Sequence, residues 1–158
     1  SYTFSYYDPE IGWQKELEDT LTHEYTHMTH LRAFNNAGHL MDWFGEGLAE
    51  YTSDSTRVWE VSSALRQDAL IPIIDPVTAV YKQDLMHLYI LEKDVSLAYA
   101  ESQALILFLY DRGGMDMVWK LAETYDTVQD FDKALRQVVG LSYTDFDRAW
   151  RQWMSERY

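Results

Sequence analysis

The most informative absence in this chain of 158 residues is cysteine. With none present, disulfide bonds and thiolate metal sites are excluded, so a bound metal ion would need His, Asp or Glu ligands. Long apolar runs are missing too, and the longest, residues 104–110, falls far short of the roughly 20 residues of a membrane-spanning helix. The lack of cysteine leaves the cellular compartment open.

Positive charge is also scarce. The chain has 13 Lys and Arg residues against 26 Asp and Glu residues, which gives a net charge of −13. Nucleic-acid binding needs clusters of Lys and Arg for the phosphates, and the sequence has none, which argues against a nucleic-acid partner. The same charge disfavours an anionic membrane surface. It is compatible with a peptide or protein partner, or simply with solubility.

No targeting segment is recognisable in the sequence. The chain begins with Ser1 instead of an initiator Met, and no basic segment precedes an apolar stretch, as it would in a signal peptide. We therefore interpret the sequence as a trimmed or processed piece. Its length suits a single domain with its own hydrophobic core.

The apolar pattern and the helix-ending signals predict a mainly helical protein. Residues 1–7 alternate aromatic and hydroxyl side chains, which predicts one short strand. Asp8 and Pro9 provide the cap and first turn of a long helix, and Gly113-Gly114 should close a buried one. The predicted helices cover residues 9–35, a second one that starts at 43 or 45 and ends at 51, then 55–70, 96–112, 115–125, 130–139 and 142 to the C-terminus, with a further short one from Asp75.

The first predicted helix contains an HExxH motif, His23-Glu24-Tyr25-Thr26-His27. Spacing of four residues places His23 and His27 one turn apart on the same face, so that a single ion can bridge them. Zinc suits two neutral imidazoles and a carboxylate. Glu24 lies about 60° around the helix from His27 and can reach a metal-bound water as a general base. The alternative interpretation is a solvated face of His and Glu side chains.

A third ligand separates the families that use HExxH. The metzincin pattern requires Gly at position 30 and His at position 33, where this chain has His30 and Ala33. Another pattern takes a glutamate from a following helix. Here eighteen residues lie between His27 and Glu46, which stands within the segment WFGEGLAEYTSDSTR. With both motifs the chain resembles the gluzincin metallopeptidases, in particular the aminopeptidase-N-like and bacterial peptidase MA-like enzymes. Locally it is also similar to bacterial collagenases.

This resemblance implies one catalytic zinc ion with His23, His27 and Glu46 as ligands and Glu24 as general base. It also implies that Glu50, one turn after Glu46, holds the other nitrogen of a ligand histidine. The alternative interpretation of Glu50 is an exposed helix carboxylate. The expected fold is a mainly α, zincin-like gluzincin catalytic domain with at most a short N-terminal strand or hairpin. Its parts would be an edge strand at 1–8, zinc-binding helices at 9–54 and a helical subdomain at 55–158.

The family also needs a hydrogen-bond donor for the oxyanion that forms during hydrolysis. In aminopeptidase-N-like enzymes a tyrosine opens a helix with Ala and two apolar residues five to seven places later, and Tyr99 matches this offset. The residues directly after Tyr99 differ from the family's. Other candidates therefore remain open: Tyr81, Tyr89 and, as in thermolysin-like enzymes, His87. We expect His30 and His39 to be polar neighbours of the cleft and not ligands.

The function implied by the resemblance is zinc-dependent hydrolysis of peptide bonds by a zinc-activated water. An endopeptidase is favoured because the GxMEN-type segment that captures a substrate amino terminus is absent. Two alternatives stay open: a catalytically silent or latent zinc-binding module for protein interaction or regulation, and a helical domain without metal. Bacterial peptidases of this kind are often secreted or on the cell surface. The oligomeric state and the substrate cannot be inferred from the sequence.

Overall fold

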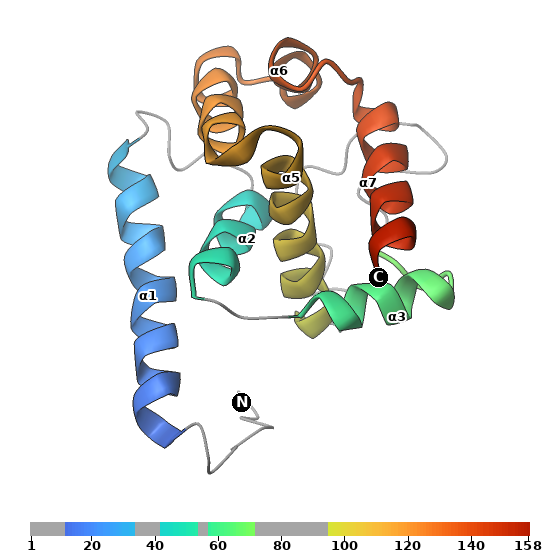
Figure 1. The fold of residues 1–158 in the computed structure, drawn as a ribbon. Coiled ribbons are helices and arrows are strands. Elements are labelled where there is room, and N and C mark those ends of the chain that lie inside the picture. Colours follow the sequence, from blue (N-terminus) through green and yellow to red (C-terminus); the bar gives the residue numbers. More distant parts are fainter. Residues whose placement is uncertain (1–11, 34–41, 54–56, 72–94) are drawn as a thin grey trace.

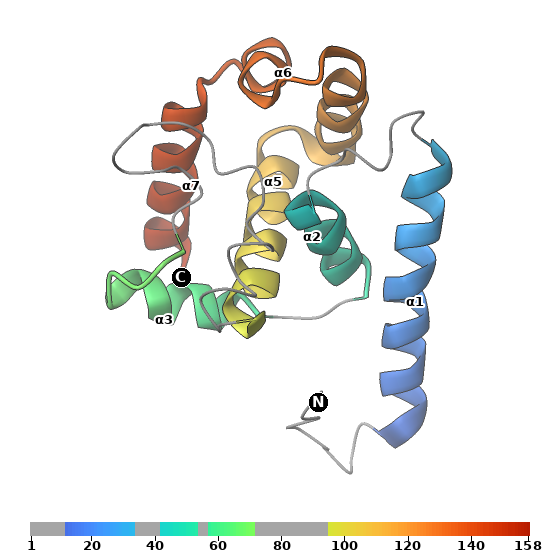
Figure 2. The same ribbon diagram turned by 180° about the vertical axis from the view of Figure 1, so that it is seen from behind.

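The computed structural model of the protein describes residues 12–33, 42–53, 57–71 and 95–158. All regular structure within these ranges is helical, which confirms the prediction of a mainly helical protein. Most of the helices contact α5 (Val95–Val128), which lies at the centre of the molecule in Figures 1 and 2, two views from opposite sides. The strand predicted for residues 1–7 and the short helix predicted from Asp75 lie outside the described residues.

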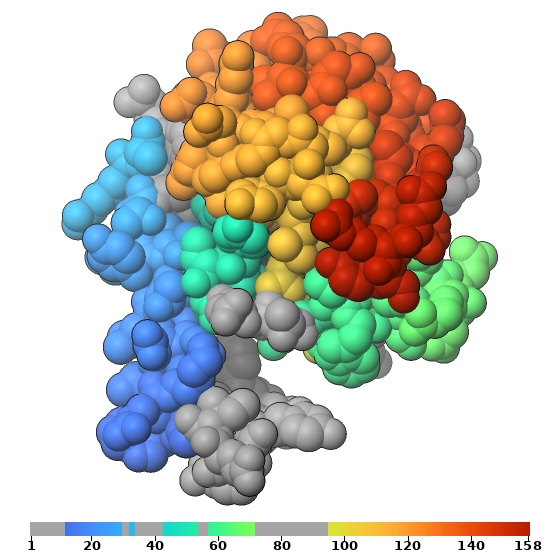
Figure 3. Space-filling view, viewed as in Figure 1, coloured from blue at the N-terminus to red at the C-terminus, as the bar shows by residue number. Residues whose placement is uncertain are grey.

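Helix α1 (Gly12–Ala33) carries the HExxH motif and lies along one side of the molecule, next to α2 (Asp42–Thr52) (Figures 1 and 3). The two helices are joined by a hydrogen bond of 2.7 Å between the hydroxyl oxygens of Thr26 and Thr52. Because Thr26 is almost fully buried, this hydrogen bond lies inside the helix contact. The α1–α2 contact therefore holds the HExxH turn against the helix that carries Glu46.

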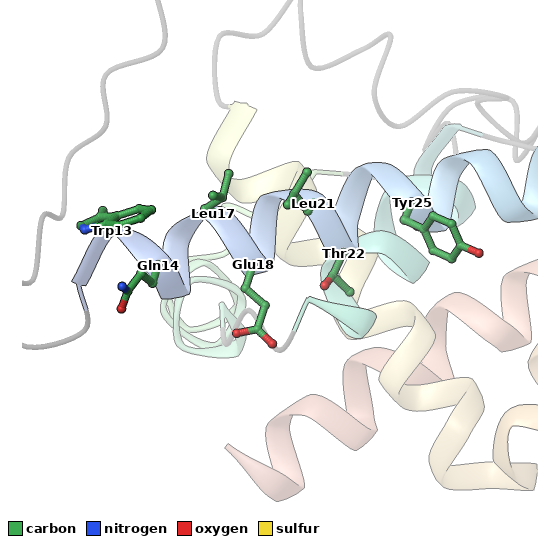
Figure 4. Close-up of a pocket in the computed structure, with 7 residues that line it drawn as sticks. All are labelled: Trp13, Gln14, Leu17, Glu18, Leu21, Thr22 and Tyr25. Carbon is green, nitrogen blue, oxygen red and sulfur yellow. The ribbon is translucent and has the colours of Figure 1, made fainter.

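The part of α1 that precedes the motif has a shallow apolar groove. Figure 4 shows side chains that line it, with Trp13, Leu17 and Leu21 along one side of the helix. These three apolar side chains recur every four residues and are between 49% and 64% exposed. The apolar spacing along this part of α1 therefore does not mark a face buried against the described residues. None of the helices that the structure describes is long and apolar enough to cross a membrane.

Helix α5 is the centre of the hydrophobic core. It contacts α2, α3 (Val58–Arg66), α6 (Phe131–Val138) and α7 (Tyr143–Arg157). A helix with neighbours around it must be apolar on most of its surface, and the run predicted as a buried helix segment, residues 104–110, lies here. The largest side chains with almost no exposure in the described core are Trp43, Leu48, Leu105, Ile106, Leu109, Leu121, Leu135, Phe146 and Trp150.

Helices α2 and α5 approach so closely that a glycine is required between them. A Cβ atom at Gly47 would lie 2.3 Å from the backbone oxygen of Ser102 and 2.9 Å from Cγ1 of Ile106. Carbon and oxygen atoms in contact are normally separated by about 3.3 Å or more, so any side chain here would push the two helices apart. Gly47 thus sets the position of the helix that carries Glu46 and Glu50.

The second half of α5 turns away from the first at the predicted Gly113-Gly114 break. Both residues have non-helical backbone angles, and Gly114 has φ of 69° and ψ of −173°, a conformation open essentially to glycine alone. Beyond the break, α6 and α7 begin at Asp130 and Ser142, whose side chains accept hydrogen bonds from backbone N–H groups of the first turn. Both helix starts were predicted from the sequence.

Candidate metal centre

Helix α1 places one nitrogen atom of each of two imidazole rings close together. His23 and His27 are one turn apart, and their Nε2 atoms are 3.1 Å from each other. The rings are inclined by 71°, with centroids 4.9 Å apart, so that both edges point to the same place. Two neutral imidazoles in this arrangement present two lone pairs to one ion.

Helix α2 supplies a carboxylate to the same place. Oε2 of Glu46 lies 3.4 Å from Nε2 of His23 and 3.3 Å from Nε2 of His27. Glu46 can face α1 because the other side of α2 carries Phe44 and Leu48, which are buried in the core with 2% exposure each. The amphipathic pattern of α2 thus turns its carboxylate toward the two histidines.

The three donor atoms have the spacing that a zinc ion requires. Tetrahedral zinc with bonds of about 2.0–2.1 Å separates its ligand atoms by about 3.3–3.4 Å. The three separations here are 3.1, 3.3 and 3.4 Å. In addition, Oε2 of Glu46 is buried and lies at ion-pair distance from both histidine nitrogens, so a cation at this place would offset the lost hydration of the carboxylate. Two imidazoles and one carboxylate therefore fit zinc.

Charge accumulates at these residues in the metal-free protein. Hydrogen bonding to Glu46 and Glu50 raises the pKa of His23 from 6.5 to about 9. Burial by itself raises the pKa of Glu46, but hydrogen bonding to His23 and His27 outweighs this effect and lowers it from 4.5 to about 2. In the metal-free protein the two carboxylates therefore favour the positively charged form of His23.

Glu50 lies behind His23, on the side away from Glu46. Its Oε1 is 3.4 Å from Nδ1 of His23, and the residue is only 7% exposed. A carboxylate beside Nδ1 favours the tautomer with a proton on that nitrogen, which leaves the lone pair of Nε2 for a metal. The Nδ1–Glu50 contact also restricts rotation of the imidazole ring.

Glu24 and Tyr99 are placed differently. Glu24 lies on α1 with its side chain exposed. Tyr99, in the first turns of α5, has its ring centroid 6.4 Å from that of His23. The other proposed donors, Tyr81, Tyr89 and His87, lie outside the described residues, as does His39, and the side chain of His30 is not described.

Comparison with known families gives this geometry its context. The sequence model of the Peptidase MA superfamily matches residues 8–156, which is nearly the whole chain. The chain belongs to the peptidase MA superfamily. It is therefore a metallopeptidase, and membership of the superfamily implies zinc as its metal. Searches of curated proteins and of solved structures returned no significant match.

Two residues beside the candidate metal centre were not singled out from the sequence. Arg57, which precedes α3, has Nε 3.4 Å from Oε2 of Glu50, and Gln103 of α5 hydrogen-bonds the backbone of both Glu50 and Arg57. The sequence signal that could have revealed Gln103 is the polar segment Glu101-Ser102-Gln103 inside a helix predicted to be buried. Buried polar side chains need hydrogen-bond partners, so such a segment indicates a buried hydrogen-bond network.

Proposed function

We propose that this peptidase MA domain is an endopeptidase with one catalytic zinc ion held by His23, His27 and Glu46. The observation that carries the proposal is the triangle of donor atoms, with separations of 3.1–3.4 Å and a buried carboxylate oxygen directed into it. The endopeptidase assignment rests on the sequence, in which a GxMEN-type segment for a substrate amino terminus is absent.

Glu24 is the proposed general base. It follows His23 directly on α1 and is exposed, so its carboxylate is accessible to water. A zinc ion bound there would supply a Lewis acid that lowers the pKa of water and polarises the substrate carbonyl. Glu24 takes the proton from the attacking water and passes it to the leaving amine nitrogen.

Glu50 and Tyr99 complete the proposed centre. Glu50 holds His23 through Nδ1 and so fixes the direction of Nε2. Tyr99 lies beside His23, and its phenol hydroxyl would donate a hydrogen bond to the oxyanion that develops on the carbonyl. The substrate is a peptide or protein.

The substitution Glu24→Gln tests the proposal most sharply, because it removes the base and leaves the donor triangle intact. We expect one zinc ion per chain, as in the parent, and a loss of casein cleavage of about 10²–10⁴-fold. Glu123→Gln makes the same change in charge on an exposed position of α5 and should leave both zinc content and cleavage unchanged. Cleavage by Glu24→Gln at the parent rate would refute the role of Glu24. Bound zinc without cleavage in the parent would favour a silent zinc-binding module.

A further inference from the structure

Arg57 contacts two members of the proposed centre with one guanidinium group. Its Nε lies 3.4 Å from Oε2 of Glu50, and its Cζ lies 5.8 Å from the centroid of the Tyr99 ring. These residues come from different elements, because Glu50 is on α2, Tyr99 is on α5 and Arg57 precedes α3. The guanidinium of Arg57 therefore links the carboxylate of Glu50 to the aromatic ring of Tyr99.

The two carboxylate oxygens of Glu50 contact different residues. Oε1 faces Nδ1 of His23 at 3.4 Å, and Oε2 faces Nε of Arg57 at 3.4 Å. The carboxylate is nearly buried, so a cationic partner is needed to offset the loss of its hydration. A chain of contacts therefore runs from Arg57 through Glu50 to His23, whose other nitrogen belongs to the donor triangle.

The backbone around Arg57 is fixed by a buried amide. The N–H of Arg57 donates to Oε1 of Gln103 at 3.1 Å, and Nε2 of Gln103 donates to the carbonyl oxygen of Glu50, also at 3.1 Å. Only this orientation of the amide satisfies both backbone groups. Gln103 is 3% exposed and stands one turn after Tyr99 on α5. Gln103 therefore holds Arg57 and Glu50 in register with the helix that carries Tyr99.

We propose that Arg57 is a positioning residue of this metallopeptidase centre, which holds Glu50 against His23 and Tyr99 beside it. The inference rests on the proposed function, because it assigns zinc to His23 and the oxyanion contact to Tyr99. Arginine suits the task better than lysine. Its planar guanidinium can pair with a carboxylate at its edge while its face covers an aromatic ring, whereas an ammonium is a single point charge.

Three variants test the role of Arg57. Arg57→Gln removes the charge, Arg57→Lys keeps the charge but not the planar group, and Arg148→Gln removes an arginine from an exposed ion pair on α7, far along the chain from the centre. Zinc dissociation constants would be measured with the metal-free proteins by competition with a chromophoric chelator, and kcat and KM with a fluorogenic peptide. Melting temperatures would be recorded for all three variants and the parent.

We expect Arg57→Gln to weaken zinc binding by about 10–100-fold, as is typical when a residue supporting a metal ligand is lost. Arg57→Lys should restore most of the zinc affinity through its charge, but kcat should stay low with KM near the parent value, because the Tyr99 ring is no longer covered. Arg148→Gln should match the parent in every measurement.

Other results would overturn the inference. Parent-like zinc affinity in Arg57→Gln would do so, and so would a rise in KM alone, which is the result expected if Arg57 bound substrate directly. Equal loss of zinc affinity in Arg57→Gln and Arg57→Lys would also contradict it, because the Glu50 contact depends on charge. Absence of zinc from the parent is a different failure, since it would refute the proposed function and this inference with it.

Discussion

Gly47 connects the packing of the core to the geometry of the metal centre, and Gly47→Ala is expected to impair both. The new Cβ would lie 2.3 Å from the backbone oxygen of Ser102. To reach a normal separation of about 3.3 Å, α2 must move by about 1 Å relative to α5. Glu46, the residue directly before Gly47, moves with it. Metal sites tolerate ligand displacements of only about 0.2 Å, so the shift exceeds this tolerance several times over.

The magnitude follows from two opposing effects. Overpacking of a core destabilises by about 1–3 kcal/mol, and alanine is favoured over glycine in a helix by about 1 kcal/mol. We therefore expect a net loss of up to about 2 kcal/mol, which lowers the melting temperature by up to about 8 °C in a chain of this size. Zinc affinity should fall by about tenfold or more, and Gly47→Val should be worse in both respects.

Thermal melting followed by circular dichroism and chelator competition for zinc are the two assays. The far-ultraviolet spectrum of Gly47→Ala should remain helical, because the added methyl group displaces α2 without unfolding it. A variant with the parent's melting temperature and the parent's zinc affinity would refute the reasoning, since it would mean that the α2–α5 contact adapts without moving Glu46.

Two further predictions concern charge and catalysis. In the metal-free protein the pKa of His23 is raised from 6.5 to about 9 and that of Glu46 is lowered from 4.5 to about 2. The contribution of these two groups to stability is complete between about pH 4.5 and 6.5, and it is lost as the pH rises through 9 or falls through 2. The melting temperature of the metal-free protein should therefore be higher between about pH 4.5 and 6.5 than on either side. A melting temperature that does not change with pH would contradict this. Tyr99→Phe should reduce kcat/KM by about 10²–10³-fold with zinc affinity unchanged, and parent-like turnover would reassign the oxyanion contact.

The parts of the structure that were predictable from the sequence depend on local spacing. A four-residue interval on a helix places His23 and His27 one turn apart in whatever tertiary structure surrounds them. The glycine pair at residues 113–114 and the caps Asp130 and Ser142 are equally local, because each acts on the backbone within one turn. Such features follow from short segments, and they were predicted at the correct residues.

The remaining features depend on contacts between residues distant in the sequence. Arg57 is separated from Gln103 by 46 residues, and Glu50 is separated from Gln103 by 53. Which polar groups meet across such intervals depends on how α2, α3 and α5 pack, and no periodicity within one helix contains that information. The role of Gly47 is similar, because a glycine inside a predicted helix only becomes a requirement once Ser102 is known to lie against it.

The central claim is that His23, His27 and Glu46 hold one zinc ion with a place left for water and substrate. X-ray absorption at the zinc edge of the stoichiometrically loaded protein tests this most directly. We expect a four-coordinate ion with two imidazole nitrogens and the remaining ligands oxygen, at about 2.0–2.2 Å. A third imidazole, or a six-coordinate ion with oxygen ligands alone, would contradict this assignment of the metal centre.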